Sequence, residues 1–175
     1  MFFIVDFDRE LILTPNQLGK HIKNKIKAKL IEKVQGECTE KNGYLICVIR
    51  IDDIPNGMIM DTTGNIIFNV SFSAIVMKPI KGEVCEGVVD TVDNNGIIVS
   101  VGPIKTFISK SDFPPNFIYD SNNNNYYTSN DSGKMEKGGE IRFRIKQLQF
   151  YENSFRPLGT MRENYLGPIS QSNMY

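Results

Sequence analysis

Residues 82–109 read GEVCEGVVDTVDNNGIIVSVGPIKTFIS, and the turns and apolar runs of this stretch indicate the architecture of the second half of the chain. Asn95-Gly96 is a strong hairpin-turn signal, and runs rich in Val and Ile stand on both sides of it. Gly102-Pro103 then ends the second apolar run before a third begins. We therefore predict strands at 83–92, 97–101 and 104–108, and a short helical turn at 109–112.

Downstream of this stretch, two further strands are predicted on either side of a polar segment. The sequence IRFRIK at 141–146 alternates with period two, which places Ile141, Phe143 and Ile145 on a buried face. Residues 155–161 form the fifth strand candidate, whereas 114–139, rich in Asn and Ser, reads as a long mobile insertion outside the core. This order of elements predicts a small closed Greek-key barrel of the OB type.

The first half of the chain predicts an α+β domain. Residues 1–8 alternate as a strand, and Thr14-Pro15 has the form of a helix start, followed by apolar residues at Leu18, Ile22, Ile26, Leu30 and Val34. Strands are predicted at 37–39, 44–52, 66–70 and 72–80, so one long helix lies across an antiparallel sheet. Pro79 and Gly82 mark the boundary, which gives domains 1–79 and 80–175.

Composition excludes several function classes. The 175 residues contain 20 Lys+Arg and 20 Asp+Glu, so any nucleic-acid contact has to be local. His21 is the only histidine, and Cys38, Cys47 and Cys85 form no CxxC pair, which argues against a catalytic triad, a zinc site or any other cofactor. We interpret the cysteines as buried, reduced thiols and expect a soluble intracellular protein without a membrane span or a catalytic role.

Several motifs in this order resemble known proteins. The stretch 82–109 resembles an S1 domain, an RNA-binding member of the OB class. The resemblance extends along the chain through five further stretches: MFFIVDFDREL at 1–11, residues 34–39 followed by Gly43-Tyr44, FSAIVMKPIKGEV at 72–84, residues 101–103 and residues 163–167. Together they are similar to the seventh-subunit family of eukaryotic RNA polymerase II, and to its archaeal and polymerase I and III counterparts. The resemblance implies a truncated ribonucleoprotein-like N-terminal domain, a C-terminal S1-type barrel and a non-catalytic polymerase subunit in the nucleus.

The barrel carries the candidate RNA-binding residues. S1 domains commonly present a nucleic-acid-contacting side chain at the end of the third strand, where Phe107 stands here. Cations flank it and also alternate along the fourth strand, so that they share one face as a phosphate-binding stripe. The full set is Lys105, Phe107, Lys110, Arg142, Arg144 and Lys146.

Plainer interpretations of these residues stay open. The stripe of Arg142, Arg144 and Lys146 is equally typical of a solvated strand face. A phenylalanine such as Phe107 is equally typical of a barrel core. Tyr126 and Tyr127 in the insertion are further stacking candidates, although aromatic residues in mobile loops are commonly only tolerated. The lysines of the predicted helix favour a solvated face opposite its apolar stripe.

The first domain carries the candidate polymerase contacts. Its turns and helix entrance are expected to gather at one end as a docking tip: Pro15, Asn16, Gln17, Ile54, Pro55, Asn56, Gly57, Thr62, Thr63 and Gly64. The resemblance implies that this tip docks into the polymerase core beside the clamp, against the largest subunit and a small clamp-side subunit. It also implies a stalk heterodimer with the fourth subunit, for which a sheet edge including 76–80 is a natural surface, and contact with single-stranded RNA or single-stranded DNA.

Two alternatives to this function remain at the level of sequence. The equivalent subunit of polymerase III has the same two-domain layout. A free-standing S1-type factor of translation or RNA decay is the alternative from another class.

Overall fold

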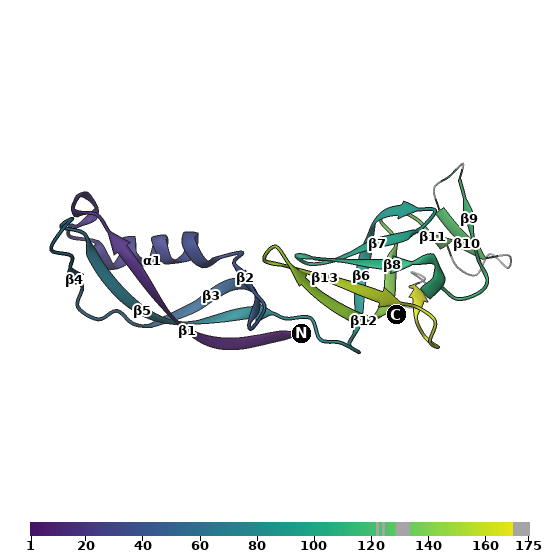
Figure 1. Ribbon diagram of the computed structural model, residues 1–175, viewed down its shortest axis with the longest axis horizontal. Helices are drawn as coiled ribbons and strands as arrows, with labels where there is room; N and C mark the ends of the chain where they lie inside the picture. Colours follow the sequence, from purple (N-terminus) through teal and green to yellow (C-terminus); the bar gives the residue numbers. More distant parts are fainter. Residues whose placement is uncertain (122, 124, 129–133, 170–175) are drawn as a thin grey trace, which may run out of the picture. The chain divides into compact units, whose positions relative to one another are not determined.

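The computed structural model describes residues 1–121, 123, 125–128 and 134–169. The chain divides into two compact units, an N-terminal unit Met1–Lys78 and a C-terminal unit Pro79–Tyr175 (Figure 1). The N-terminal unit has one sheet, the C-terminal unit has two, and each unit has its own buried residues.

One helix and an antiparallel sheet form the N-terminal unit. Its sheet has the strand order β1-β5-β3-β2, with β4 pairing β5. In Figure 1 helix α1 runs along one side of this sheet. The elements are β1 Phe2–Leu13, a 3₁₀ turn η1 Pro15–Gln17, α1 Ile22–Val34, β2 Cys38–Thr39, β3 Gly43–Asp53, β4 Met58–Ile59 and β5 Ile66–Met77.

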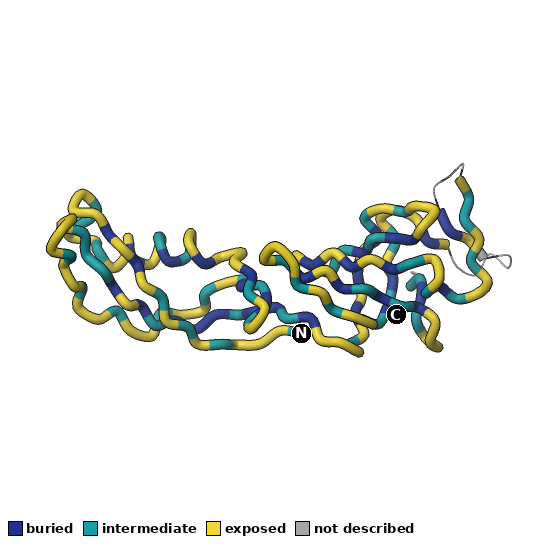
Figure 2. Tube along the Cα trace, in the orientation of Figure 1, coloured by how far each residue is buried: buried dark blue, intermediate teal, exposed yellow. Residues whose placement is uncertain are grey.

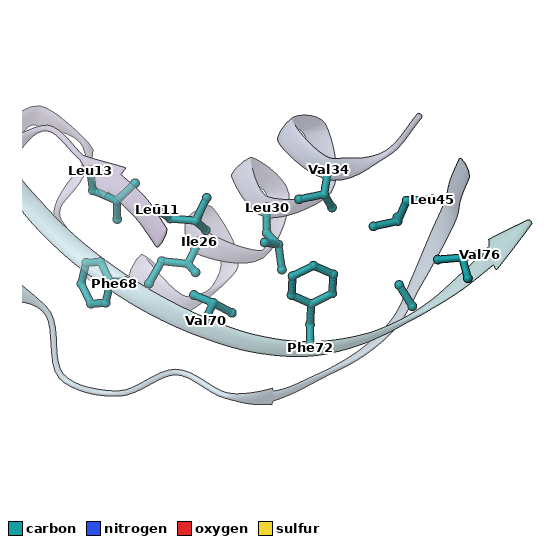
Figure 3. Packing of buried hydrophobic residues seen from close by; sticks show 11 residues of the cluster. Leu11, Leu13, Ile26, Leu30, Val34, Leu45, Phe68, Val70, Phe72 and Val76 are labelled. Atoms are coloured by element: carbon teal, nitrogen blue, oxygen red, sulfur yellow. The ribbon is translucent and has the colours of Figure 1, made fainter. Parts of the chain in front are cut away.

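The core of this unit lies between α1 and the sheet. Ile26, Leu30 and Val34, at four-residue steps on the helix, are buried against Leu11 of β1 and Phe72 of β5 (Figure 3). Exposed and buried positions alternate along the strands in Figure 2, as expected for a sheet covered on one face. The predicted apolar stripe of the helix is therefore confirmed from Ile26 to Val34.

Two boundaries differ from the sequence prediction. Strand β1 continues to Leu13 rather than ending at residue 8, because it pairs with β5 along its whole length and buries Leu11 and Leu13. The helix begins at Ile22 rather than after Thr14, since the Thr14-Pro15 signal forms only the turn η1, in which the Gln17 side chain accepts from the Thr14 amide. Strand β5 is also one continuous strand, where two were predicted.

A closed barrel forms the C-terminal unit. The sheet order β13-β8-β7-β6-β12-β14, with an additional β12–β13 pairing, returns to its starting strand. All five predicted barrel strands are present, and Ile141, Phe143 and Ile145 are buried as predicted. The elements are β6 Val84–Asp93, β7 Gly96–Val101, β8 Ile104–Ser109, η2 Lys110–Asp112, β12 Glu140–Tyr151, β13 Ser154–Thr160 and β14 Gly167–Pro168. This closure confirms the OB-type fold.

The insertion at 114–139 forms strands where the structure describes it and contributes buried residues, so the prediction that it lies outside the core is wrong there. It forms a three-stranded sheet of β9 Phe117–Asp120, β10 Asn125–Thr128 and β11 Lys134–Met135. Tyr126 is fully buried, packs edge-on against Phe113 with ring centroids 4.8 Å apart, and donates from its hydroxyl to the carbonyl oxygens of Asp93 (2.8 Å) and Asn94 (3.0 Å). Tyr126 is therefore a core residue and not a free stacking surface.

The buried hydroxyl of Tyr126 makes the stability of the C-terminal unit depend on alkaline pH. Burial, together with nearby Tyr119 and Asp93, raises the pKa of Tyr126 from 10.0 to about 12. The proton is then held more tightly by the folded chain than by the unfolded chain, so this contribution is complete below pH 10 and is lost as pH rises toward 12. Unfolding free energy measured against pH is expected to fall across this window, and Tyr126→Phe is expected to remove that part of the fall.

Candidate nucleic-acid interface

An apolar row crosses the outer face of three neighbouring barrel strands. Phe107 of β8 pairs with Ile98 of β7 on one side and with Leu158 of β13 on the other. Its neighbours Thr106 and Ile108 point inward and are buried, whereas Phe107 is 37% exposed. The alternative that Phe107 belongs to the barrel core is therefore excluded, and the outer face offers an aromatic ring to a ligand.

Lys105 lies on the same face of β8 as Phe107 and is bound to a carboxylate. Its Nζ donates to Asp90 at 2.7 Å, and both side chains are solvent-accessible. This hydrogen bond and the charge of Lys105 lower the pKa of the Asp90 carboxyl, which therefore stays ionised at neutral pH. Lys105 thus carries its positive charge next to a permanent negative one.

The cations of β12 are paired in the same way. Nε and Nη2 of Arg142 lie 2.8 and 2.7 Å from Oε1 of Glu86, and Nη2 of Arg144 lies 3.0 Å from Glu163. Lys146 falls at a bulge between Ile145 and Gln147, and its Nζ lies 2.9 Å from Asp112. The predicted stripe is present on the outer surface, but each of its three charges already has a carboxylate partner.

Exposed ion pairs of this kind contribute only about 0–1 kcal/mol each to stability, because solvent screens them. Exchanging a carboxylate for an RNA phosphate therefore costs little. Lys110 differs from the other four predicted cations, since it has no ion pair to any described residue; it lies in η2, directly after β8.

Sequence reasoning missed one aromatic residue on this unit. Tyr151, at the end of β12, is 58% exposed, and the guanidinium carbon of Arg156 lies 5.2 Å from its ring centroid. The turn between them has Glu152 and Asn153 in left-handed conformations, φ 50° and 54°, as in a type I′ hairpin. The bulge at Lys146 shifts the alternation of the strand by one residue, so the pattern of 141–146 extended to residue 151 would place Tyr151 on the buried face. Its exposed position therefore could not be found from the alternation.

The predicted docking tip residues converge at one end of the N-terminal sheet. Leu13, which precedes η1, pairs with Ile66, and Ile59 of β4 pairs with the same residue. The three tip segments therefore adjoin one sheet end: 15–17 after β1, 54–57 before β4 and 62–64 before β5. Gly57 packs so closely that a Cβ there would overlap the side chains of Ile66 and Phe68, which leaves this segment little freedom.

The same sheet end exposes large apolar side chains that the sequence did not single out. Met58 is 63% exposed and Ile59 is 68% exposed. Ile12, which is 46% exposed, pairs with Ile67, and Ile67 in turn pairs with Met58. A short apolar row is therefore available for contact beside the turns, and only the unusual run of Met and Ile at 58–60 hints at it in the sequence.

The described residues were also compared with the features of a metal site, a reactive cysteine and a membrane span. No group of three or more His, Cys, Asp or Glu in that part of the chain is placed to hold a metal ion. Cys38 and Cys85 are buried as expected, and burial and Glu83 raise the pKa of Cys85 to about 11; Cys47, in contrast to the prediction, is exposed. None of the described helices has the length and hydropathy of a membrane span.

Comparison with protein families matches both units. Residues 10–64 match a family model described as the SHS2 domain found in the N terminus of Rpb7p and Rpc25p. Residues 83–171 match a family model described as RNA polymerase III subunit Rpc25. Both models come from the same group of polymerase subunits.

Curated relatives match the whole chain. The chain is 38% identical to DNA-directed RNA polymerase II subunit RPB7 of Saccharomyces cerevisiae, over 97% of this chain and 100% of that protein. It is 32% identical to subunit RPB7 of Glycine max, over 97% of both chains, and 31% identical to subunit rpb7 of Schizosaccharomyces pombe, over 96% of this chain and 99% of that one. With this identity along its full length, the chain belongs to the RPB7 family of DNA-directed RNA polymerase II subunits.

Proposed function

We propose that this chain is a non-catalytic stalk subunit of nuclear RNA polymerase II. It pairs with the fourth subunit, docks on the polymerase core near the clamp and the RNA exit path, and binds nascent single-stranded RNA during initiation and elongation. Full-length similarity to RPB7 proteins supports the polymerase role. The observation that carries the RNA-binding part is the exposed ring of Phe107 on the outer face of a closed OB-type barrel.

Binding of RNA by this face combines stacking with phosphate contacts. Phe107 offers a ring on which a base stacks, and Lys105, Lys110, Arg142, Arg144 and Lys146 supply the positive charges. Because four of these five charges are paired with carboxylates, the net attraction for RNA is modest. Tethering to the polymerase raises the effective concentration of transcript near the barrel, so modest affinity is sufficient. Single-stranded DNA has the same phosphates and bases and is the alternative ligand.

Phe107→Ala is expected to weaken binding of a single-stranded oligouridine of about twelve nucleotides by at least about fivefold, since one stacked base contributes about 1–3 kcal/mol. Phe107→Tyr keeps the ring and is expected to bind normally. Fluorescence anisotropy with labelled RNA measures both variants. Tyr165→Ala, which removes a ring that is 92% exposed elsewhere on the unit, is the matched control. Equal affinity of Phe107→Ala and wild type would contradict the site.

The free edge of β1 supports a surface for the fourth subunit. Strand β1 stands at the end of the order β1-β5-β3-β2, and its first residues Phe2, Phe3 and Ile4 are 63%, 43% and 70% exposed. They pair with Met77, Val76 and Ile75, so this apolar edge adjoins the 76–80 region. An edge strand with exposed apolar residues is typical of a protein contact, since it otherwise promotes aggregation.

The docking tip supports attachment to the polymerase core. Its turns are fixed by Pro and by close packing at Gly57, so they lose little conformational entropy on binding. The exposed side chains of Ile12, Met58 and Ile59 add apolar area beside them. We assign this end to contact with the largest subunit and the small clamp-side subunit.

Membership of polymerase III is the second candidate, favoured by the match of residues 83–171 to the Rpc25 model. The relatives that match the whole chain carry polymerase II names, which favours polymerase II. Mass spectrometry of proteins that copurify with the tagged chain distinguishes the two, since each polymerase has its own largest subunits. Recovery of neither set would favour a free-standing S1-type factor.

A further inference from the structure

We propose that a groove beside η2 binds one nucleotide of single-stranded RNA, holding its phosphate with Lys110 and Arg162. This proposal rests on the proposed RNA-binding function and extends it beyond the Phe107 face. The groove has a volume of about 540 Å³. Its lining residues combine two cations with aromatic and proline rings and include no carboxylate: Lys110, Ser111, Phe113, Pro114, Pro115, Phe117 and Arg162.

The charges of this groove differ from those of the rest of the barrel. Lys105, Arg142, Arg144 and Lys146 are each paired with an acidic side chain. Neither Lys110 nor Arg162 has an ion pair to a carboxylate in the part of the chain that the structure describes. The groove therefore gathers two uncompensated positive charges, which an anion can contact without displacing an internal partner.

Arg162 is held in place for such a contact. Its Nε donates to the backbone carbonyl of Ser111 at 2.8 Å, which ties the guanidinium to η2, where Lys110 also lies. This contact uses only one of its donor groups, and the two terminal nitrogens make no hydrogen bond to another described residue. A planar guanidinium with free terminal donors matches the geometry of a phosphate.

One wall of the groove is fixed to the barrel, and the others carry partly exposed rings. Phe113 is buried and packs edge-on against Tyr126, which is itself anchored to the β6–β7 turn. Pro114, Pro115 and the half-buried Phe117 follow directly in the chain. The rings of Phe117, Pro114 and Pro115, which are at least partly exposed, accept a nucleobase without regard to its identity, whereas an isolated inorganic anion gains nothing from them.

Continuity along the chain favours RNA as the occupant. Strand β8 runs directly into η2, so Lys110 follows Phe107 by three residues, about 10 Å along an extended backbone. A strand whose base stacks on Phe107 therefore reaches the groove with a neighbouring nucleotide. A phosphorylated peptide has similar charge but gains no advantage from the adjacent Phe107 surface, so displacement of RNA by such a peptide tests the assignment.

The test measures the affinity of the full chain for labelled single-stranded oligouridine over a series of salt concentrations. Lys110→Gln with Arg162→Gln is expected to weaken binding several-fold and to reduce the salt slope by about 0.7 for each lost phosphate contact. Phe117→Ala is expected to weaken binding with the salt slope unchanged. Lys81→Gln with Lys137→Gln removes two other cations of this unit and is the matched control, expected to keep most of the affinity. Arg162→Lys keeps the charge, and thermal unfolding of each variant checks that loss of the Ser111 contact has not unfolded the chain.

The outcomes separate this proposal from the proposed function. If Phe107→Ala weakens binding but the groove variants bind with wild-type affinity and salt slope, RNA binding stands and the groove assignment is overturned. If the control pair reduces affinity and slope as much as the groove pair, the effect is general charge, and the assignment is again overturned. If the wild-type chain binds no RNA, both proposals fail together. If a phosphorylated peptide displaces RNA from the groove but not from Phe107, the groove belongs to a peptide partner and the assignment to RNA is wrong.

Discussion

Replacing Met58 and Ile59 together with aspartate is expected to release the chain from the polymerase core, with a loss of affinity of at least about 30-fold. Both side chains are more than 60% exposed in the free chain, so their replacement leaves the core of the N-terminal unit intact. Docking would bury them, and each aspartate would then carry an unpaired charge into an apolar contact. Central apolar contacts commonly contribute about 2 kcal/mol or more to binding, which is the basis of the expected factor.

Pull-down of the tagged chain measures this effect through the large polymerase subunits that are recovered with it. The fourth subunit is expected to be recovered in full, because its proposed surface on β1 lies at the other end of the sheet from β4. Ile49→Asp is the control, since Ile49 is 49% exposed on β3 of the same sheet and lies outside the tip. Undiminished recovery of the core, or loss of the fourth subunit alone, would contradict the docking assignment.

Tyr126→Ala is expected to destabilise the C-terminal unit by about 3–5 kcal/mol, the usual cost of removing a large aromatic side chain from a core. The change deletes the edge-on contact with Phe113 and both hydrogen bonds to the β6–β7 turn. It leaves a cavity between the insertion and the barrel. The three-stranded sheet β9–β11 then loses its attachment, because Tyr126 and Met135 are the described residues of β10 and β11 that are fully buried.

Hydrogen exchange measures this loss locally, since amides of β9 and β10 and of the β6–β7 turn are expected to lose protection while those of the N-terminal unit keep theirs. Tyr127→Ala is the matched control. Tyr127 is the next residue of the same strand, points to the other face and is 40% exposed, so its truncation is expected to cost less than about 1 kcal/mol. Equal effects of the two substitutions would contradict the assignment of Tyr126 as the residue that attaches the insertion to the barrel.

Local patterns were sufficient for most of the fold. The Asn95-Gly96 turn, the alternation of 141–146 and the four-residue steps on the helix each describe one element and its buried face, and all three are confirmed. The prediction that the insertion lies outside the core was wrong because the contacts that bury it are not local. Its composition is that of a loop, and the burial of Tyr126 depends on the carbonyl groups of a turn more than thirty residues away, which no local window contains.

The candidate site shows the same limit. Strand periodicity places Phe107 on one of the two faces of β8, and the sequence leaves open whether that face is the outer one. The ion pairs of the stripe join residues that are distant in the chain: Arg142 with Glu86, Arg144 with Glu163 and Lys146 with Asp112. Strand alternation therefore identifies the cations but not which of them are compensated. No local pattern places Arg162 beside η2, because that position depends on how the barrel closes.

The pairing of β1 with β5 has a mechanical consequence. The two strands match residue for residue from Phe2 opposite Met77 to Leu13 opposite Ile66, without a bulge, whereas the pairing of β3 with β5 is interrupted by bulges. This ladder extends about 40 Å from the tip to the last residues of the N-terminal unit. A force applied along β5 between these ends loads all the hydrogen bonds between β1 and β5 in shear at the same time. They therefore share the load and do not break one after another. The β1–β5 strand pair therefore resists extension, and a displacement of one end of the pair moves the other end by nearly the same distance.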